Sequence, residues 1–544
     1  MLLASPAVAD PAPRPVVEQP QRDRSPLKLI PEAQSGQARA AGATAAVPAR
    51  FDVDGDGRSD MLNREWDGQL YTVLTTDPSP EGAWTGMGGS TVLKNDIVPI
   101  GDQDGDGAPE VLTVSKYGQL ELFYGANSTY AYHAWTGGSW TVYNKVFSPG
   151  DVNGDGRADL MGRQHNGDLY LYLATGRLAS PFGPRTRVGT NWGVYDQIVG
   201  LGDNDGDGKG DVIARNPAGK LFFYGSTGKP AAPFKPAKQV GTGWDVYNQL
   251  FPMDDQNGDG RADLYARDQK GALWSYHGLG DGRLATRVQV GYDRGGRSVD
   301  QFSGSGAVAS SGKNAFMARD NKGTVYWYGG LNDGRLTARD PLEGDATGAD
   351  LLYAADLDGD TYGDLLQVYR GTLYHGETVL GSSWHVYNTI VGPGDLNGDG
   401  RGDLLARDGS GTLYLHRGNG EGTGFSSRIR IGTGWNAYNR ILGAGDYSGD
   451  GRVDLLARDK AGDLYLYRGT GSATNPFAGR VRIGTSWNAY GKIVAPGDLN
   501  GDNKADLLGV AANGDLYRYL GTGTGAFGPR ARIGTGYQVY NTLY

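Results

Sequence analysis

Short segments rich in aspartate and glycine recur along this 544-residue chain, and one of them reads GDLNGDGRGDLLARD from Gly394 to Asp408. Oxygen-bearing side chains stand at positions 1, 3, 5 and 9 of its loop: Asp395, Asn397, Asp399 and Asp403. Glycines at positions 4 and 6 let the backbone turn around a point, and the main-chain carbonyl at position 7 can point inward. An EF-hand loop wraps Ca²⁺ with this spacing, because Ca²⁺ prefers six to eight oxygen ligands. Position 12 is not glutamate and no helices are expected on either side, so we predict a calcium loop between β-strands.

Nine such loops are predicted. An ordinary Asx/Gly turn would explain a single copy, but nine copies in the same phase favour Ca²⁺, with up to nine sites. Mg²⁺ is the less favoured ion, because it demands tighter octahedral geometry. The predicted ligands at positions 1, 3, 5, 7 and 9 are Asp52, Asp54, Asp56, Arg58 and Asp60; Asp102, Asp104, Asp106, Ala108 and Glu110; Asp151, Asn153, Asp155, Arg157 and Asp159; Asp203, Asp205, Asp207, Lys209 and Asp211; Asp255, Asn257, Asp259, Arg261 and Asp263; Asp356, Asp358, Asp360, Tyr362 and Asp364; Asp395, Asn397, Asp399, Arg401 and Asp403; Asp446, Ser448, Asp450, Arg452 and Asp454; Asp498, Asn500, Asp502, Lys504 and Asp506.

The charge of the chain supports a bound cation. Positions 1, 3, 5 and 9 of the nine loops hold 31 of the 61 acidic residues, and the formal net charge is −9. Nine Ca²⁺ ions would change that charge to +9. Cysteine is absent from the chain, so calcium is the expected cross-link in place of disulfides.

The loops also define a repeat. Successive loops start 39 to 52 residues apart, except for one interval of 101 residues that contains a unit without a loop. Each unit has four runs of strand length separated by turn signals, which predicts one propeller blade. We therefore expect an all-β fold, a β-propeller of about ten four-stranded blades. One ring is favoured and two smaller packed rings are the alternative, and the C-terminal strand at Tyr540–Tyr544 is expected to complete the first blade.

The N-terminus differs from the repeats. Ala7 and Ala9 form an A-x-A pattern before Asp10, so residues 1–9 are interpreted as the remnant of a signal peptide, with a disordered N-terminus as the alternative. Residues 10–48 lack any strand or helix periodicity and are expected to be a disordered linker. Residues 49–544 form the predicted propeller. No run of eighteen apolar residues occurs, so no transmembrane segment is expected, and we predict a secreted, extracellular protein.

A second repeated element, GTGWNAYN or a variant of it, lies in the connector that leads from one unit to the next. An aromatic ring beside an amide could bind a sugar through CH contacts and hydrogen bonds. The alternative is that these rings wedge neighbouring blades together. The candidate ligand-binding residues are Trp140, Tyr143, Trp192, Tyr195, Trp244, Tyr247, Trp384, Tyr387, Trp435, Tyr438, Trp487 and Tyr490.

The loop and the four-strand period resemble the FG-GAP/VCBS-type repeats of integrin-like β-propellers, over roughly residues 49–544. The resemblance is specific in the loop and weak elsewhere, because ARD or GRQ stands where such repeats have a GAP-like segment. The units look more like those of secreted actinobacterial proteins and propeller lectins. This resemblance implies a binding or scaffolding platform, often carbohydrate-directed, and rarely catalysis.

Three functions are compatible with these features. The favoured one is a multivalent binding module for a glycan or another cell-surface polymer, and the alternative is a protein-interaction or adhesion scaffold, or the targeting subunit of a secreted assembly. A hydrolase or lyase is the least favoured, since the six histidines, His133, His165, His277, His375, His385 and His416, share no spacing typical of a catalytic triad or metal centre. Basic residues are dispersed, which argues against nucleic acid as a partner.

Overall fold

The structure is a computed structural model, and it describes residues 17, 27–29, 47–65, 68–75, 83–84, 94–115, 117–127, 130–268, 270–293, 299–307, 314–330, 334–344, 346–359, 363–443 and 445–544. Over these residues the chain forms ten antiparallel β-sheets, nine with four strands and one with five. The predicted all-β propeller of four-stranded blades is confirmed. No helix among the described residues is both long and apolar enough to cross a membrane.

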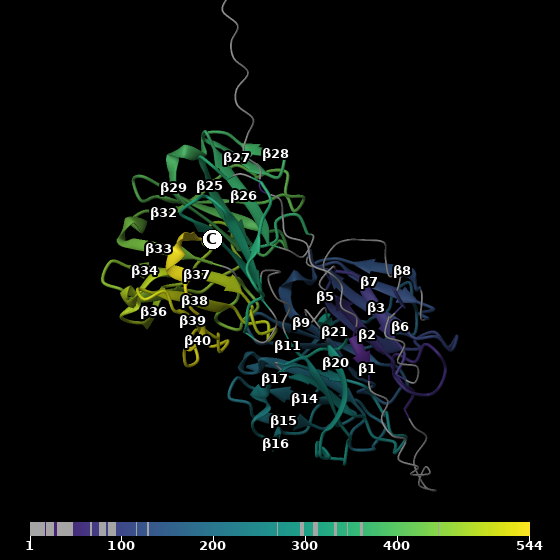
Figure 1. Cartoon of the computed structure of the whole chain (residues 1–544). Coiled ribbons are helices and arrows are strands. Elements are labelled where there is room, and N and C mark those ends of the chain that lie inside the picture. The colour runs from purple at the N-terminus through teal and green to yellow at the C-terminus, as the bar shows by residue number, and fades with distance from the viewer. Residues whose placement is uncertain are drawn as a thin grey trace, which may run out of the picture.

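The ten blades form two rings of five (Figure 1). Ten clusters of buried hydrophobic side chains lie between neighbouring blades, and each cluster joins blades of the same ring. Phe251 and Phe302, for example, stack with ring centroids 4.3 Å apart in the cluster between the last and first blades of the first ring. The prediction of one wide ring is wrong, and the alternative of two packed rings is correct.

The first ring contains blades 1 to 5, with strands given from the centre outward. They are blade 1, β21 (Val299–Phe302), β2 (Met61–Glu65), β3 (Leu70–Val73) and β4 (Ala83–Trp84); blade 2, β5 (Lys94–Gly101), β6 (Glu110–Ser115), β7 (Leu120–Tyr124) and β8 (Tyr132–Gly137); blade 3, β9 (Tyr143–Gly150), β10 (Asp159–Gln164), β11 (Leu169–Tyr172) and β12 (Thr186–Gly189); blade 4, β13 (Gln197–Gly202), β14 (Asp211–Arg215), β15 (Leu221–Tyr224) and β16 (Lys238–Gly241); blade 5, β17 (Tyr247–Pro252), β18 (Leu264–Asp268), β19 (Ala272–Tyr276) and β20 (Val288–Asp293).

The second ring contains blades 6 to 10. They are blade 6, β41 (Tyr540–Leu543), β22 (Ala315–Asp320), β23 (Val325–Gly329) and β24 (Asp340–Pro341); blade 7, β25 (Ala349–Ala354), β26 (Asp364–Tyr369), β27 (Thr372–His375) and β28 (Thr378–Gly381); blade 8, β29 (Tyr387–Gly394), β30 (Asp403–Asp408), β31 (Leu413–His416) and β32 (Ile429–Gly432); blade 9, β33 (Tyr438–Leu442), β34 (Leu455–Asp459), β35 (Leu464–Tyr467) and β36 (Val481–Gly484); blade 10, β37 (Tyr490–Gly497), β38 (Asp506–Ala511), β39 (Leu516–Tyr519) and β40 (Ala531–Gly534).

Each ring is closed by a strand that is distant in sequence from its partner. In the first ring β21 pairs with β2, with Asn63 opposite Phe302. In the second ring the C-terminal strand β41 pairs with β22 of blade 6, with Ala318 opposite Leu543. The prediction that the C-terminal strand completes the first blade is therefore wrong, because β21 already fills that place when the chain leaves the first ring. Both rings hide the sheet edge that an open ring would expose.

The unit without an acidic loop is the point at which the chain crosses between the rings. After β21, residues 303–307 run through the centre of the first ring. There Gly304 donates from its main-chain N–H to Ile97, Ile198 donates to Gly306, and the Lys145 ammonium reaches the carbonyl of Ala307 at 3.0 Å. The next paired strand is β22 of the second ring. Because β21 and β22 belong to blades of different rings, no acidic loop joins them as the inner and second strands of one blade.

The described residues of the N-terminal segment pair with both rings, because Val17 forms a β-bridge with Gly344 of the second ring and residues 27–29 form a strand. Residues Leu27–Leu29 (β1) pair with β20 as the fifth strand of blade 5 (Figure 1), and Leu27 is buried. This strand lies within the segment expected to be disordered. The predicted signal-peptide remnant, residues 1–9, lies outside the described residues.

The two ends of the innermost strands define two faces of each ring, which we call the connector face and the loop face. The connector face carries seven one-turn 3₁₀ helices, η1 (Trp140–Val142), η2 (Trp192–Val194), η3 (Trp244–Val246), η4 (Trp384–Val386), η5 (Trp435–Ala437), η6 (Trp487–Ala489) and η7 (Tyr537–Val539), and the loop face carries the acidic loops. The connector face of the first ring contacts the loop face of the second. A cavity of about 510 Å³ lies between them, and its lining includes Trp140, His165, Asp446 and Lys504.

Candidate calcium loops and interblade grooves

The first aspartate of each loop organises the backbone. In the loop of blade 8, Asp395 accepts hydrogen bonds from the main-chain N–H of Gly398 through Oδ1 and of Gly400 through Oδ2, both at 2.7 Å. Both glycines have positive φ, 80° and 83°, which favours glycine at these two positions. The backbone therefore curls around the Asp395 carboxylate.

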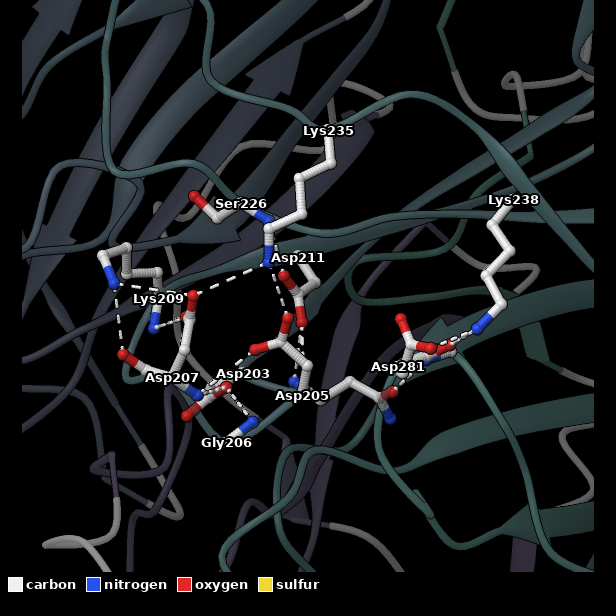
Figure 2. Close-up of polar contacts among 12 residues, drawn as sticks. Asp203, Asp205, Gly206, Asp207, Lys209, Asp211, Ser226, Lys235, Lys238 and Asp281 are labelled. Carbon is white, nitrogen blue, oxygen red and sulfur yellow. Dashed lines mark hydrogen bonds and ion pairs between the residues drawn. The ribbon is translucent and has the colours of Figure 1, made fainter.

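The ninth residue fixes the loop to the rest of its blade. Asp403 is fully buried, and it accepts from the N–H of Leu396 at 3.0 Å and of Gly418 at 3.1 Å. The same two contacts hold Asp211 in blade 4, from Asn204 at 3.0 Å and Ser226 at 2.8 Å (Figure 2). The ninth residue of the loop is therefore held in place by a main-chain N–H just after the third strand of the blade.

Positions 5 and 7 of each loop are joined by a hydrogen bond. The position-5 carboxylate accepts from the main-chain N–H of position 7, as Asp399 does from Arg401 at 3.0 Å. The same contact occurs in eight of the nine loops, at Arg58, Ala108, Arg157, Lys209, Arg261, Arg401, Arg452 and Lys504. Two predicted ligands of the remaining loop, Asp360 and Tyr362, lie outside the described residues.

The acidic side chains converge in several loops. Groups of ligand atoms lie within 4.8 Å of one another at Asp52, Asp54 and Asp60; Asp102, Asp104 and Glu110; Asp203, Asp205 and Asp211; Asp446, Asp450 and Asp454; and Asp358, Asp364 and His375. Figure 2 shows the convergence in blade 4, where Asp203, Asp205, Asp207 and Asp211 surround one small region. Lys235 binds the outer side of this cluster, with its Nζ 3.0 Å from Asp205 Oδ2.

Without a cation this arrangement is electrostatically unfavourable. Burial, together with the neighbouring loop carboxylates, raises the pKa of Asp60 to about 7 and of Asp211 and Asp403 to about 8. Burial and the charge of Asp446 likewise raise the pKa of Asp454 well above its ordinary value. A bound cation would remove this repulsion and keep the carboxylates ionised.

Two buried oxygen atoms test whether the loops suit a metal ion. Glu110 is fully buried, and its Oε2 accepts from the N–H of Gln103 while its Oε1 has no hydrogen-bond partner. Asn500, at position 3 of the last loop, is also buried, and its Oδ1 has no partner. Leaving such atoms unpaired is costly, and both belong to predicted ligands. An oxygen-rich site of this kind fits Ca²⁺ better than a transition metal.

In two loops a histidine contacts the ninth carboxylate. His277 Nδ1 lies 3.0 Å from Asp263 Oδ2 in blade 5, and His375 Nε2 lies 3.0 Å from Asp364 Oδ1 in blade 7. The hydrogen bond to Asp364 raises the pKa of His375 to about 9, although burial opposes the shift. In these two loops an imidazole nitrogen contacts the ninth carboxylate, so both loops differ chemically from the loops in which that carboxylate accepts only from main-chain N–H groups.

The connector aromatics lie inside the blade cores. The tryptophans of the six connectors are 5 to 8% exposed, and each belongs to the hydrophobic cluster between two blades. Trp435 packs against Tyr438 and Tyr467, with ring centroids 5.6 and 4.9 Å away. The tyrosines that follow are also held, as in the 2.5 Å contact between the hydroxyls of Tyr438 and Tyr467. Burial leaves little ring surface for stacking on a sugar at Trp140, Tyr143, Trp192, Tyr195, Trp244, Tyr247, Trp384, Trp435, Tyr438, Trp487 and Tyr490, and Tyr387 is half-buried in the same arrangement. These residues wedge neighbouring blades together.

A set of exposed arginines beside these wedges was not predicted. Arg428 donates to Tyr387 Oη at 2.7 Å, and its guanidinium lies 4.4 Å from the ring centroid of Tyr414. Equivalent arginines lie over an aromatic ring in five further blades, Arg185, Arg287, Arg339, Arg480 and Arg530. In the sequence several of them stand four residues before the glycine of IGT or VGT, a repetition that could have identified them.

The groove beside Arg428 is open to solvent. It has a volume of about 380 Å³ and is lined by Ser382, Ser383, Trp384, Val386, Tyr387, Asp408, His416 and Arg428. Asp408, Arg428 and the serine hydroxyls offer hydrogen-bond donors and acceptors at its rim. Burial lowers the pKa of His416 to about 4, so this imidazole is neutral at pH 7.

Three segments match the FG-GAP-like repeat family: residues 102–162 in the first ring, and residues 395–457 and 446–509 in the second. Each segment runs from one acidic loop through a blade into the second strand of the next. A search of curated proteins found no match.

Similar solved structures include lectins and a gluconolactonase. A lectin from Agrocybe aegerita that recognises non-reducing terminal N-acetylglucosamine is 16% identical, with 92% of this chain and 98% of that chain covered and a TM-score of 0.22. A lectin from Burkholderia pseudomallei is 12% identical, with coverages of 81% and 100% and a TM-score of 0.24. The periplasmic gluconolactonase of Pseudomonas aeruginosa is 13% identical, with coverages of 78% and 96% and a TM-score of 0.26. The family match and the ten sheets together establish this chain as a β-propeller protein that carries FG-GAP-like repeats in both of its rings.

Proposed function

We propose that this protein is a secreted, calcium-stabilised, multivalent binding module that recognises carbohydrate, as a polysaccharide or on a cell surface. The observation that carries the proposal is the solvent-exposed groove at Arg428, whose arginine recurs over an aromatic ring in five other blades. Repeated shallow sites on a rigid support suit a repetitive polymer, because avidity multiplies weak affinities.

The Arg428 groove offers the chemistry that a sugar requires. Sugar hydroxyls need donors and acceptors held in place, and Arg428 is held by Tyr387 and Tyr414 while it stays exposed. The Asp408 carboxylate and the hydroxyls of Ser382 and Ser383 add acceptors and donors in the same groove. The site therefore differs from the tryptophan faces expected from the sequence, although it adjoins them.

Calcium in this proposal is structural. The nine loops lie between strands at the loop face, whereas the Arg428 groove adjoins η4 at the opposite end of the inner strand. Calcium would be held by the loop carboxylates and would keep the blades in register. The role proposed for the chain is binding and not catalysis, since the described histidines lie on separate strands and connectors.

The test is a glycan and cell-wall polysaccharide array probed with the full chain in millimolar Ca²⁺, repeated after EDTA. Arg428→Gln combined with Arg480→Gln and Arg530→Gln removes the exposed arginine of three neighbouring blades, and we expect apparent affinity to fall at least ~10-fold through lost avidity. Arg430→Gln is the matched control, because Arg430 is exposed on β32, the strand that begins one residue after Arg428. Absence of glycan binding by protein shown to be folded in Ca²⁺ would refute the carbohydrate proposal.

A further inference from the structure

The contact between the two rings shows what a connector face can bind. Asn144, on the connector face of the first ring, donates through Nδ2 to the main-chain carbonyl of Asp450 at 2.6 Å. Two blades further on, Asn248 donates through Nδ2 to the carbonyl of Asn500 at 3.1 Å. Both acceptors lie in acidic loops of the second ring. His165 adds a contact of 2.9 Å between its Nδ1 and the same Asp450 carbonyl.

The contact residues occupy one equivalent position in consecutive blades. Asn144, Asp196 and Asn248 each follow the connector tyrosine, and in blade 4 Asp196 pairs with Lys504 of the last loop at 2.8 Å. Burial favours the neutral form of Asp196, but Arg215 and Lys504 together hold its pKa below the ordinary value. Three blades therefore use the same sequence position to bind an acidic loop face.

The solvent exposure of the acidic loops differs between the loops that contact the other ring and those that do not. Residues 446–454 and 498–506 include no exposed residue among those described. Each loop of the first ring has at least two exposed residues, such as Asp207 and Gly208 in blade 4. The chain thus covers the loops of blades 9 and 10, whereas the loop of blade 8, with Gly398 and Arg401 exposed, and the loops of the first ring reach solvent.

The connector face of the second ring repeats the binding position and is also free. Asn388, Asn439 and Asn541 follow their connector tyrosines and are exposed. Asn439 accepts from Arg458 Nε at 3.0 Å, just as Asn144 accepts from Arg163 Nε at 2.9 Å. The Asn439 amide is therefore oriented like that of Asn144, with its Nδ2 available to an incoming carbonyl, whereas Nδ2 of Asn388 already donates to the carbonyl of Asp408 at 3.4 Å.

The two free faces carry groups of opposite charge. The first-ring loops hold eighteen carboxylates at positions 1, 3, 5 and 9 and four basic residues at position 7, so five divalent cations would leave these loop positions with a formal charge of −4. On the second ring Arg440 and Lys460 are exposed, and both lie close to the connector position, after Asn439 and after β34 respectively. Opposite charges favour encounter of these faces.

We propose that the connector face of the second ring binds the loop face of the first ring in a second copy of this chain. The contact repeats the one that joins the two rings within one chain. The two faces lie on different rings, so the association is head-to-tail and extends into open chains unless its rotation closes. A polymer of this kind would multiply the grooves presented to a surface.

Sedimentation velocity of the full chain in Ca²⁺, over a concentration series, tests the proposal. We expect the weight-average sedimentation coefficient to rise steadily without a plateau at the dimer. Arg440→Glu should weaken association at least ~10-fold, corresponding to about 1.4 kcal/mol, and Asn439→Ala should weaken it in the same direction. Arg430→Glu is the control for charge reversal on an exposed strand, and circular dichroism establishes that each variant is folded.

The proposal is overturned if the chain stays monomeric at every concentration, or if Arg430→Glu and Arg440→Glu weaken association equally. Raising the NaCl concentration provides a further check, because charged faces in water attract each other less at high salt. Association that is insensitive to salt would contradict the role of charge.

Discussion

The side-chain amide of Asn144 in the first ring lies 2.6 Å from the main-chain carbonyl of Asp450 in an acidic loop of the second ring. The backbone of that loop is held around the carboxylate of Asp446, which accepts from the N–H of Gly449 and of Gly451, both at 2.6 Å. Any ion that shapes the loop therefore also shapes the contact between the rings.

We predict that calcium in this loop couples folding of the second ring to its contact with the first. Asp454→Asn and Asp159→Asn should each remove one bound Ca²⁺ ion. At a Ca²⁺ concentration 100 times the dissociation constant of the site, each substitution should lower the unfolding free energy by about 2.7 kcal/mol. Only Asp454→Asn should also raise hydrogen exchange at Asn144 and His165, because the loop of Asp159 is not in the interface. Hydrogen exchange with mass spectrometry measures both effects. Equal exchange at Asn144 in the two variants would show that the loop and the interface are independent.

The pH dependence of stability should change sign with calcium. The pKa of Asp60 and Asp159 is raised to about 7, and that of Asp211 and Asp403 to about 8, chiefly by burial. These acids are protonated more readily in the folded chain than in the unfolded one. Their contribution is therefore fully present below pH ~4 and is lost as pH rises through 7 to 8.

After EDTA we accordingly expect the midpoint temperature of thermal unfolding to decrease as the pH rises from about 5 to about 9. In Ca²⁺ it should rise over the same interval, because the ion binds the ionised carboxylates. Calorimetry at several pH values, in one buffer series with and without Ca²⁺, distinguishes the two trends. A metal-free chain that becomes more stable as pH rises would contradict the electrostatic account of the loops.

Substitutions at a wedge and at a groove should have separable effects. Trp435→Ala removes a side chain that is 8% exposed between blades 8 and 9, and we expect a loss of about 3–5 kcal/mol in unfolding free energy. Arg428→Gln should cost little stability, within about 0.5 kcal/mol as is usual for surface positions, and should weaken glycan binding at its own groove. Denaturant unfolding and binding isotherms corrected for the folded fraction measure the two. If folded Trp435→Ala protein loses glycan binding and Arg428→Gln protein keeps it, the tryptophans and not the arginines form the glycan site.

The C-terminal strand should control only the second ring. Removal of Tyr540–Tyr544 deletes β41, whose Tyr540 is buried and whose register with β22 places Asp320 opposite Tyr540. We expect the second ring to lose its unfolding transition while the first ring keeps its own, since β21 closes the first ring. Differential scanning calorimetry of the full and truncated chains resolves the two transitions. A truncated chain in which both transitions persist unchanged would refute closure by this strand.

Much of the fold could be predicted from the sequence because each unit carries its own local signals. The alternation in Leu464–Tyr467 matches the alternating burial along β35, and the acidic loop gives the position of each turn. The number of rings could not be predicted in this way, because all ten units obey the same local rules. The structure shows that the one irregular interval, around residues 303–307, is the crossover between rings. The missing acidic loop was the available signal. In the sequence, a unit that has lost its loop looks the same as a unit at which the chain changes ring.

The site could be predicted only in part, for a related reason. The loop oxygens recur at fixed spacing, so Asp395 and its equivalents were identifiable one residue at a time. The connector aromatics recur equally regularly, yet repetition does not reveal whether a ring is exposed, and packing places Trp435 in the core. Arg428 was missed because its environment is formed by Tyr387 and Tyr414, which lie on two other strands of the blade.

Calcium counting by native mass spectrometry tests the central claim most directly, with the full chain titrated with Ca²⁺ and, separately, with Mg²⁺. We predict binding of up to nine Ca²⁺ ions, with the loops at Asp255 and Asp356 filling last because His277 and His375 contact their ninth carboxylates. Mg²⁺ should bind more weakly at the same sites. A chain that binds no Ca²⁺, or that binds Mg²⁺ equally well, would contradict the assignment of these loops as calcium sites.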